Sequence, residues 1–359
     1  MEFTLGELFS GPGGLSHGAM NVNFNHNNEQ FNIRHGWAND FHKDSCETYK
    51  QNIDGANDDN VFFGDVKELN IDALPFIDAF AYGFPCNDFS LVGEQLGFNG
   101  KFGPLYSYGI NVINRFNPHF FVAENVGGIT SANEGKSFKK ILHDLENSGE
   151  NGYNLTINLY RSEKYGIPQT RHRIIIVGIR KDHDLLFQVP APTTPNQENY
   201  RTSREALEIP PIPLNALNNE RTRQSAKVIE RLSYINPGEN VWKEGLPKHL
   251  QLNVKGAKLS QIYKKLHPDK PSYTITGSGG GGTHGYHYAE NRALTNRERA
   301  RIQTFPDDYL FLGSKESVRK QIGMAVPPVL SKIVFESILR TFAGINYAHV
   351  EPSYAYENR

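Results

Sequence analysis

Along the first 180 or so residues, short apolar runs alternate with stretches of helical periodicity. Seven runs have the length of buried strands, and they fall at residues 4–9, 33–39, 61–66, 77–82, 119–123, 154–160 and 173–178. Helical patterns lie between them, at residues 15–20, 43–52, 105–116 and 137–147. Such alternation is typical of α/β proteins with a mainly parallel sheet, which bind ligands at the carboxyl ends of their strands. We therefore expect functional side chains directly after the strands.

The alternation stops near Lys181, where the character of the sequence changes. Proline and glycine become frequent, and helical periodicity returns only from Thr295. A chain of 359 residues normally forms two domains, or one large domain with an insertion. We predict a large domain of residues 1–185 plus 319–359 and a smaller domain of residues 186–318. The last residues, 347–359, are expected to form a disordered or loosely packed tail.

Several classes of protein are disfavoured by composition. No apolar run approaches the ~20 residues of a membrane span, and the N-terminus lacks a signal-peptide pattern. The two cysteines predict no disulfide framework, and no Cys/His spacing resembles a zinc site, so we expect no metal. We therefore expect a cytoplasmic protein with no membrane partner.

Charge is unevenly distributed along the chain. The net charge is −1, but residues 201–300 hold 16 Lys+Arg against 9 Asp+Glu. This segment is therefore basic beside an acidic remainder. It indicates either a solvated surface or a site for a polyanion.

Three strand ends carry groups suited to a nucleotide-type cofactor. The glycine-rich turn Ser10-Gly11-Pro12-Gly13-Gly14 joins a strand to a helix, which is how such ligands are cradled, although its spacing differs from the dinucleotide pattern. Asp40 and Phe41 end the second strand, where a carboxylate can hold ribose hydroxyls and an aromatic ring can stack on adenine. A helix cap is the alternative role for Asp40. Asp65 ends the third strand.

Two further strand ends carry groups with catalytic potential. Gly83-Phe84-Pro85-Cys86 follows the fourth strand, an unusual place for a cysteine that only fills a core. Glu124 follows five mostly apolar residues, where a carboxylate is costly to bury without a partner. Glu124 is therefore either solvated or functional.

Together these pieces resemble the DNA (cytosine-5) methyltransferases, especially the single-chain enzymes of bacterial restriction–modification systems. The resemblance runs from Phe9 to about Phe335. Five motifs occur in the family's order: Phe9 to Leu15, Gly83 to Cys86, Glu124-Asn125-Val126, Gln169-Thr170-Arg171-His172-Arg173, and Arg297 to Asp307. It implies a Rossmann-like α/β domain that uses S-adenosylmethionine, with a smaller target-recognition domain inserted in it.

The resemblance also implies a mechanism. The thiolate of Cys86 would add to carbon 6 of a flipped cytosine, and Glu124 would donate a proton at N3, with burial keeping that carboxyl protonated. Arg171 and Arg173 would anchor the nucleotide or orient Glu124. The loop from Ser90 through residues 91–102, which we expect to be mobile, would close over the base.

On the cofactor side, the resemblance assigns a larger set of residues. It comprises Phe9, Gly11, Gly13, Gly14, Leu15, Asp40, Phe41, Asp65, Val66, Pro85, Leu105 and Ala325. Two departures from the family pattern affect this region. Phe102 replaces an arginine near the active-site loop, and Met324 replaces an asparagine that contacts the cofactor.

Target recognition is expected in the smaller domain. The candidate DNA-contacting residues are Ser90, Gln169, Thr276, Thr283, His284, Tyr286 and His287, while Lys255, Lys258, Lys264 and Lys265 would contact phosphates. A flexible surface loop is the alternative for residues 274–287. The implied partner is double-stranded DNA, bound by a monomer, with a restriction endonuclease acting on the same site. The alternatives are an RNA cytosine-5 methyltransferase, a catalytically idle DNA-binding relative and, more distantly, a nicotinamide or flavin oxidoreductase.

Overall fold

The computed structural model describes residues 1–84, 105–253, 259–277 and 281–356. The chain forms two compact units. Unit 1 comprises residues 1–161, 172–192 and 326–359, and unit 2 comprises residues 162–171 and 193–325. These limits differ from the boundaries expected at 185 and 319. Residue 186 lies within unit 1, α8 (Lys315–Met324) belongs to unit 2, and so does the short segment of residues 162–171.

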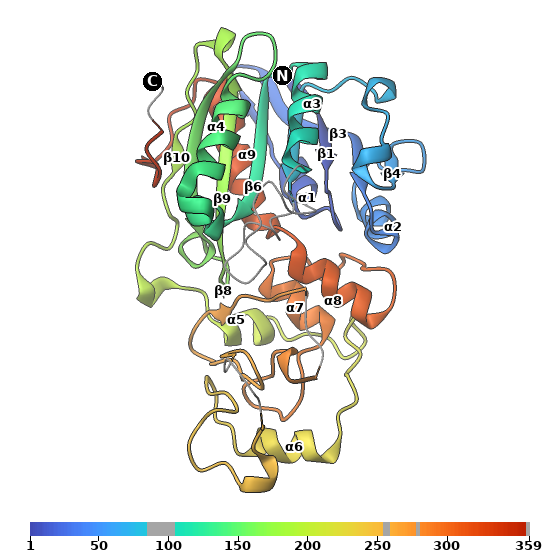
Figure 1. The fold of residues 1–359 in the computed structure, drawn as a ribbon, viewed down its shortest axis with the longest axis vertical. Coiled ribbons are helices and arrows are strands. Elements are labelled where there is room, and N and C mark those ends of the chain that lie inside the picture. Colours follow the sequence, from blue (N-terminus) through green and yellow to red (C-terminus); the bar gives the residue numbers. More distant parts are fainter. Residues whose placement is uncertain (85–104, 254–258, 278–280, 357–359) are drawn as a thin grey trace. The chain divides into compact units, whose positions relative to one another are not determined.

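Unit 1 is built on one twisted sheet, drawn in Figure 1. Its strand order is β2-β3-β1-β5-β6-β9-β7, and β4 pairs with β3. The strands are β1 (Glu2–Leu8), β2 (Asn23–His26), β3 (Glu29–Asp40), β4 (Val61–Phe63), β5 (Ala79–Gly83), β6 (Phe120–Val126), β7 (Tyr153–Arg161) and β9 (His172–Arg180). β4, β3, β1, β5 and β6 run parallel, so their carboxyl ends share one edge.

Helices cover both faces of this sheet. They are α1 (Gly14–Met20), α2 (Lys43–Asn52), α3 (Tyr106–Phe116), α4 (Lys136–Glu146) and α9 (Pro328–Phe342). The alternation of side chains along β6 assigns the faces. Phe121 joins the core that contains the apolar stripes of α3 and α4, whereas Phe120 packs on Phe335 of α9. All seven strands expected in this region are present, which confirms the α/β prediction.

Close approach of α1 to α9 explains one glycine of the first helix. A Cβ on Gly18 would lie 2.4 Å from the Pro328 carbonyl oxygen. The Ser331 hydroxyl on α9 also donates to the Leu15 carbonyl, at 2.6 Å. The C-terminal helix therefore fixes the helix that follows the glycine-rich turn.

The described part of the tail, residues 347–356, makes defined contacts, so the expectation of a disordered or loosely packed tail was wrong for these residues. β12 (His349–Val350) pairs antiparallel with β10 (Val189–Pro190). The Tyr354 ring packs edge-on against Phe138, and the Tyr356 hydroxyl donates to Glu146 at 2.9 Å. Two aromatic side chains thus find partners on α4, a possibility that the polar composition of the tail obscured.

Unit 2 has little regular structure. It contains α5 (Ser203–Glu208), α6 (Ala226–Ser233), α7 (Asn296–Ile302) and α8, with one two-stranded sheet of β8 (Gln169–Thr170) and β11 (Ser272–Tyr273). Several small apolar clusters take the place of a single core. Polar side chains that bond to main-chain carbonyls supply much of its order, as described below.

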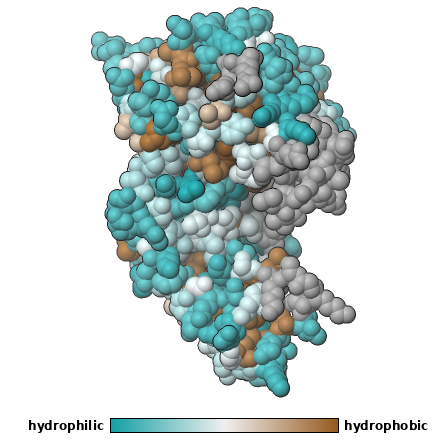
Figure 2. All heavy atoms as spheres, turned by 60° about the vertical axis from the view of Figure 1, so that its left-hand side comes forward, coloured by the Kyte–Doolittle hydropathy of each residue, from teal (hydrophilic) through white to brown (hydrophobic). Residues whose placement is uncertain are grey.

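One apolar stretch has the length and composition of a membrane span. Among the described residues, Lys315–Phe342 has the required length and composition, but 72% of its most apolar window is buried inside the protein. The stretch is two helices, α8 and α9, separated by residues 325–327. In Figure 2 the hydrophobic residues on the face shown form small brown areas among hydrophilic ones. Most of the residues 315–342 are therefore buried in the interior of the protein.

Candidate active site

The glycine-rich turn joins β1 to α1 at the carboxyl edge of the sheet. The Gly11 amide donates to Oδ2 of Asp40 at 2.8 Å, and the Gly13 amide donates to the Ser10 carbonyl at 3.0 Å. Gly11 has φ +53°, a conformation that L side chains rarely adopt, and a Cβ there would meet no atom within 4 Å. The turn therefore presents its main chain to open space.

Asp40 connects this turn to the next helix. Its second carboxylate oxygen accepts from the His42 amide at 2.8 Å, just before α2 begins. The N-cap of α2 is His42, without a side-chain cap bond, so the helix-cap alternative for Asp40 is not supported. The neighbouring Phe41 ring is 58% exposed, which is unusual for phenylalanine at the end of a buried strand.

The end of β4 has a similar open main chain. The Asn39 amide donates to the carbonyls of Phe62 and Gly64, at 2.8 and 3.2 Å, and so fixes the exit of β4. A Cβ on Gly64 would meet nothing within 4 Å. Asp65 is exposed and accepts from the Lys67 amide at 3.0 Å, while Val66 is buried.

Glu124 and Arg173 meet across β6 and β9. In the antiparallel register, Glu124 pairs with Ile175 and Val126 pairs with Arg173, so the two charged side chains are diagonal neighbours on one face. Their atoms Oε1 and Nε are 2.9 Å apart, and the side chains are only 12% and 14% exposed. Glu124 is thus partnered rather than solvated. An opposite charge at this distance favours the ionised carboxylate, whereas burial favours the protonated form expected from the sequence.

Two contacts bring the end of β5 close to Glu124. A Cβ on Gly83 would lie 3.2 Å from Oε2 of Glu124, so only glycine leaves this approach unhindered. The Asn125 amide donates to the Phe84 carbonyl at 3.0 Å and fixes the chain as it leaves the strand. Pro85, Cys86 and Ser90, together with Phe102, lie outside the described residues.

Arg171 lies in unit 2 and is 1% exposed. Its Nη1 donates to the carbonyls of Ile275 and Gly323, at 3.0 and 3.1 Å, and its Nη2 donates to that of Ala325 at 3.0 Å. These bonds tie Arg171 to two other main-chain segments of unit 2. The hydrogen bonds from Arg171 to the carbonyls of Ile275, Gly323 and Ala325 thus lie inside unit 2.

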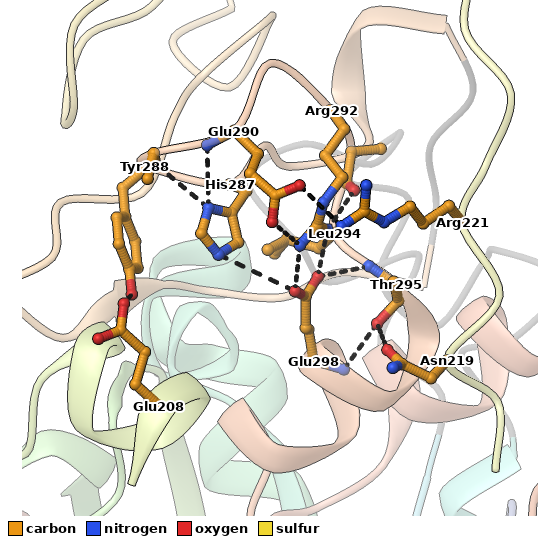
Figure 3. Close-up of polar contacts among 12 residues, drawn as sticks. Glu208, Asn219, Arg221, His287, Tyr288, Glu290, Arg292, Leu294, Thr295 and Glu298 are labelled. Atoms are coloured by element: carbon orange, nitrogen blue, oxygen red, sulfur yellow. Dashed lines mark hydrogen bonds and ion pairs between the residues drawn. The ribbon is translucent and has the colours of Figure 1, made fainter. Parts of the chain in front are cut away.

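Three of the expected DNA-contacting side chains are interior. Gln169 is fully buried, donating to Oε1 of Gln303 at 2.8 Å and accepting from the Ile275 amide at 2.8 Å. Tyr286 is also fully buried. His287 accepts from the amides of residues 289 and 290 within the polar cluster drawn in Figure 3, near the Arg292–Glu298 ion pair. Direct contact of these three with DNA is not supported by this arrangement.

The other three described candidates are more accessible. Thr276 is exposed, and Thr283 and His284 are half-buried. Nδ1 of His284 lies 3.1 Å from Nη1 of Arg319. Burial, aided by Arg319 and Arg299, lowers the pKa of His284 to about 4, so the imidazole is neutral near pH 7. A neutral ring can both donate and accept hydrogen bonds.

Sequence reasoning missed three polar residues that shape the strand ends: Glu7, Asn39 and Asn125. Each is at least 98% buried inside a β-strand. The signal was available, because a polar or charged residue within an apolar strand is costly unless it has a partner. From the sequence, the cost of burying a charge singles out Glu124 only. Among the residues that the structure describes, no group of three or more His, Cys, Asp or Glu is placed to hold a metal ion.

Comparisons with known proteins agree with this geometry. Residues 3–340 match the family model described as C-5 cytosine-specific DNA methylase. The type II methyltransferase M.BbvI of Brevibacillus brevis is 57% identical, over 100% of this chain and 96% of that protein. M.NgoFVII of Neisseria gonorrhoeae is 41% identical, over 96% and 88%. A presumed DNA modification methyltransferase of an Escherichia coli prophage shares the fold, with a TM-score of 0.68, 20% identity and coverage of 94% and 99%.

The fold and the strand-end groups, together with the match to the family model, define an α/β methyltransferase. The chain belongs to the C-5 cytosine-specific DNA methylase family, which confirms the resemblance drawn from its five motifs. It is a DNA (cytosine-5-)-methyltransferase.

Proposed function

We propose that this enzyme transfers the methyl group of S-adenosylmethionine to C5 of a cytosine in a specific duplex sequence, through a covalent adduct of Cys86. The observation that carries the proposal is the Glu124–Arg173 pair beside Gly83, which precedes Cys86 by three residues in the sequence. The carboxyl group and the guanidinium thus lie beside the end of β5, the strand that the proposed nucleophile follows in the sequence.

The residues present fit S-adenosylmethionine. Open space lies before the main chain of Gly11 and Gly64, an exposed ring follows β3 at Phe41, and carboxylates follow β3 and β4 at Asp40 and Asp65. We assign Phe9, Gly11, Gly13, Gly14 and Leu15 to the methionine part. The ribose and adenine would be held by Asp40, Phe41, Asp65 and Val66, with Leu105 and Pro85 in the same pocket. When bound, this cofactor supplies an electrophilic methyl group.

The chain's own residues would act in sequence. The Cys86 thiolate forms a bond to carbon 6 of the cytosine, which makes carbon 5 nucleophilic. Glu124 holds a proton at N3, and because its ion pair with Arg173 favours the carboxylate, that proton is taken up as the base binds. Arg173 keeps Glu124 oriented. Once C5 carries the methyl group, loss of the C5 proton to solvent, return of the N3 proton to Glu124 and departure of the Cys86 thiolate would restore the aromatic ring.

We assign DNA recognition to unit 2 and the biological role to a restriction–modification system. The relatives named above are type II methyltransferases, which supports protection of DNA from a cognate endonuclease. We propose that the enzyme acts as a monomer in the cytoplasm and forms no stable complex with that nuclease. Thr276, Thr283 and His284 are the described side chains best placed to reach base edges, because they are at least partly exposed.

Covalent trapping tests the chemistry directly. Duplex fragments of random sequence carrying 5-fluorocytosine are incubated with S-adenosylmethionine and either the wild type or Cys86→Ser. Fluorine does not leave as a proton does, so the adduct should survive denaturation with the wild type and be absent with Cys86→Ser. Sequencing the trapped fragments would give the recognition site.

Two outcomes would contradict the proposal. DNA binding without any adduct would indicate a catalytically idle relative. An adduct formed only on structured RNA, in a competition between the two substrates, would indicate an RNA methyltransferase.

A further inference from the structure

His284, which follows the glycine-rich stretch of residues 277–283 in the sequence, is held from two sides by arginines of unit 2. Nη1 of Arg319, on α8, lies 3.1 Å from the ring atom Nδ1 of His284. Nη2 of Arg299, on α7, donates to the His284 carbonyl at 2.6 Å. The side chain and the main chain of His284 are therefore each fixed by a guanidinium group.

The main chain directly after His284 is constrained as well. Gly285 has φ +71°, and a Cβ there would lie 3.0 Å from the Tyr273 hydroxyl oxygen, so another side chain would be strained. The Gly285 carbonyl accepts from the Leu294 amide at 3.1 Å. A side chain on a main chain held in this way is preorganised, which reduces the entropy lost when it binds a ligand.

The contact with Arg319 fixes the tautomer of His284. A guanidinium group carries donors only, so Nδ1 must accept, and it therefore holds no hydrogen. In a neutral imidazole the hydrogen is then on Nε2. A protonated ring would instead turn a second donor toward Arg319 across 3.1 Å. The geometry therefore favours one form, a neutral ring with its hydrogen on Nε2.

The charged groups around the ring favour the same form. Burial, and then the positive charges of Arg319 and Arg299, lower the pKa of His284 to about 4. Glu316 of α8 acts in the opposite direction, but its side chain is 85% exposed, so solvent weakens its effect. His284 is therefore neutral at the pH values where a DNA methyltransferase works.

Arg319 occupies its position at a cost in free energy. Its side chain is only 12% exposed, and its buried Nε has no hydrogen-bond partner among the described residues. Burying a donor that lacks a partner is unfavourable, and a residue that only filled space would not require a guanidinium here. The contact with His284 accounts for the charged side chain at this position.

The second ring nitrogen of His284 is available to a ligand. Nε2 makes no hydrogen bond within the part of the chain that the structure describes. The residue is half-buried, and Nε2 is not among the enclosed polar atoms, so solvent reaches it. His284 thus presents one accessible donor whose polarity is set from behind by Arg319.

We propose that Arg319 is a positioning residue that fixes His284 as a donor, and that His284 reads an acceptor atom on the major-groove edge of a base in the target duplex. The inference rests on the proposed recognition of DNA by unit 2. Guanine, adenine and thymine each offer an acceptor in the major groove, whereas cytosine offers only its amino group, a donor. His284 therefore accepts three bases at its position and rejects cytosine. Because the ring is neutral, it adds little to the general attraction for phosphates.

Duplexes that lose one acceptor at a time test this reading. The recognition site found by trapping is synthesised with 7-deazapurines, which lack N7, or with 6-thioguanine or 4-thiothymine, whose sulfur accepts weakly. Binding is measured by fluorescence anisotropy. One of these changes should weaken wild-type binding about three- to tenfold, the range for one hydrogen bond. His284→Phe should bind the unmodified duplex more weakly by a similar factor and should show no further loss with that analogue. His249→Phe, at an exposed histidine of unit 2, is the matched control and should respond as the wild type does.

A second measurement reports the tautomer of His284 without DNA. With histidine labelled at its ring nitrogens, NMR should show the hydrogen on Nε2 from about pH 5.5 to about pH 8.5. Arg319→Lys keeps a donor for Nδ1, so it should keep this tautomer and the response to the base analogue. Arg319→Met has no donor and should give a mixture of the two tautomers with a weaker response. A purely structural role of Arg319 would leave the tautomer unchanged in both variants.

Three results would overturn the proposal. The first is a hydrogen on Nδ1 in the wild type, and the second is an equal response of the wild type and His284→Phe to every analogue. The third is a lower slope of log K against log salt in His284→Phe with no lost analogue response, which would indicate a phosphate contact. Wild-type protein that binds DNA without sequence preference would instead contradict the proposed function, and the NMR spectrum would still decide the tautomer.

Discussion

At the scale of single residues, the proposed chemistry depends on a carboxyl group held by one guanidinium. Arg173 fixes the position of Glu124 and favours its ionised form. In the proposed mechanism, Glu124 would therefore gain a proton when the cytosine binds. Asn125, the next residue along β6, fixes the main chain at Phe84. Glu124 and Asn125 are adjacent on β6, and they contact Arg173 and the main chain at Phe84, respectively.

We expect Glu124→Gln to lower kcat by about two to four orders of magnitude, the range typical for loss of a general acid. The amide keeps the shape of the side chain but holds no transferable proton. Binding of S-adenosylmethionine should change by less than about twofold, because Glu124 lies outside the proposed cofactor residues. Single-turnover methylation and calorimetry measure the two quantities separately.

Arg173→Lys is the companion variant for this pair. Lysine keeps the charge but not the planar guanidinium, so Glu124 should be oriented less well and kcat should fall by less than in Glu124→Gln. Wild-type kcat in Glu124→Gln would show that proton donation at N3 is made by another group.

At the scale of elements, unit 2 is organised by buried polar side chains that bond to main-chain carbonyls. Arg171 donates to three carbonyls in two segments, at residue 275 and at residues 323–325, and Arg297 donates to the carbonyls of Leu217, Pro306 and Tyr309 at 2.7 to 2.9 Å. The two described strands of unit 2 are very short, so these bonds take the place of the inter-strand hydrogen bonds that order a larger sheet. A buried carbonyl that loses its donor costs free energy, so these arginines are expected to matter for folding.

Arg171→Ala tests this structural role. The substitution leaves three carbonyl groups without this donor, so we expect the free energy of unfolding to fall by at least about 3 kcal/mol. Denaturant unfolding measures the change, and His172→Ala, at the exposed neighbouring position, is the control. Unchanged stability with loss of DNA binding would instead favour the direct contact with a nucleotide that the sequence suggested.

The sequence predicted elements well where an apolar period was present. The seven strand runs and the helices at 43–52, 105–116 and 137–147 all have counterparts within a few residues. β2 was missed because three of its four residues, Asn23, Asn25 and His26, are polar. The available signal was the Asn27-Asn28 pair. These residues have φ of +49° and +64°, as the turn of a tight hairpin requires.

The candidate site divides in the same way. Groups at strand ends, such as Asp40 and Glu124, were predictable because a parallel sheet gathers those ends at one edge. Burial within unit 2 was not predictable, because Gln169, Tyr286 and His287 occur in a Gly-rich or motif context that resembles an exposed loop. Their partners come from distant parts of the sequence, and no local pattern encodes such contacts.

At the scale of the whole molecule, the proposed functions belong to different units, cofactor binding to unit 1 and DNA recognition to unit 2. The basic segment belongs to unit 2. The basic excess of residues 201–300 overstates the surface charge, because Arg231, Lys265, Arg297 and Arg299 are buried, against Glu298 alone among the described acidic residues there. Lys265 donates to Asn291 inside unit 2 at 2.8 Å, and Lys255 and Lys258 lie outside the described residues. Lys264 is the remaining described candidate for a phosphate contact. It lies over the Tyr273 ring at 4.9 Å.

The division between units leads to a prediction about additivity. Phe41→Ala should weaken S-adenosylmethionine binding by about 1 kcal/mol through loss of stacking and leave DNA binding unchanged. Lys264→Ala should weaken binding of all DNA sequences alike, reduce the slope of log K against log salt by about 1, and leave cofactor binding unchanged. In the double variant, the losses in kcat/KM should add within about 0.5 kcal/mol, because the residues belong to separate units. A larger deviation, measured at one salt concentration, would show that cofactor and DNA binding are energetically coupled.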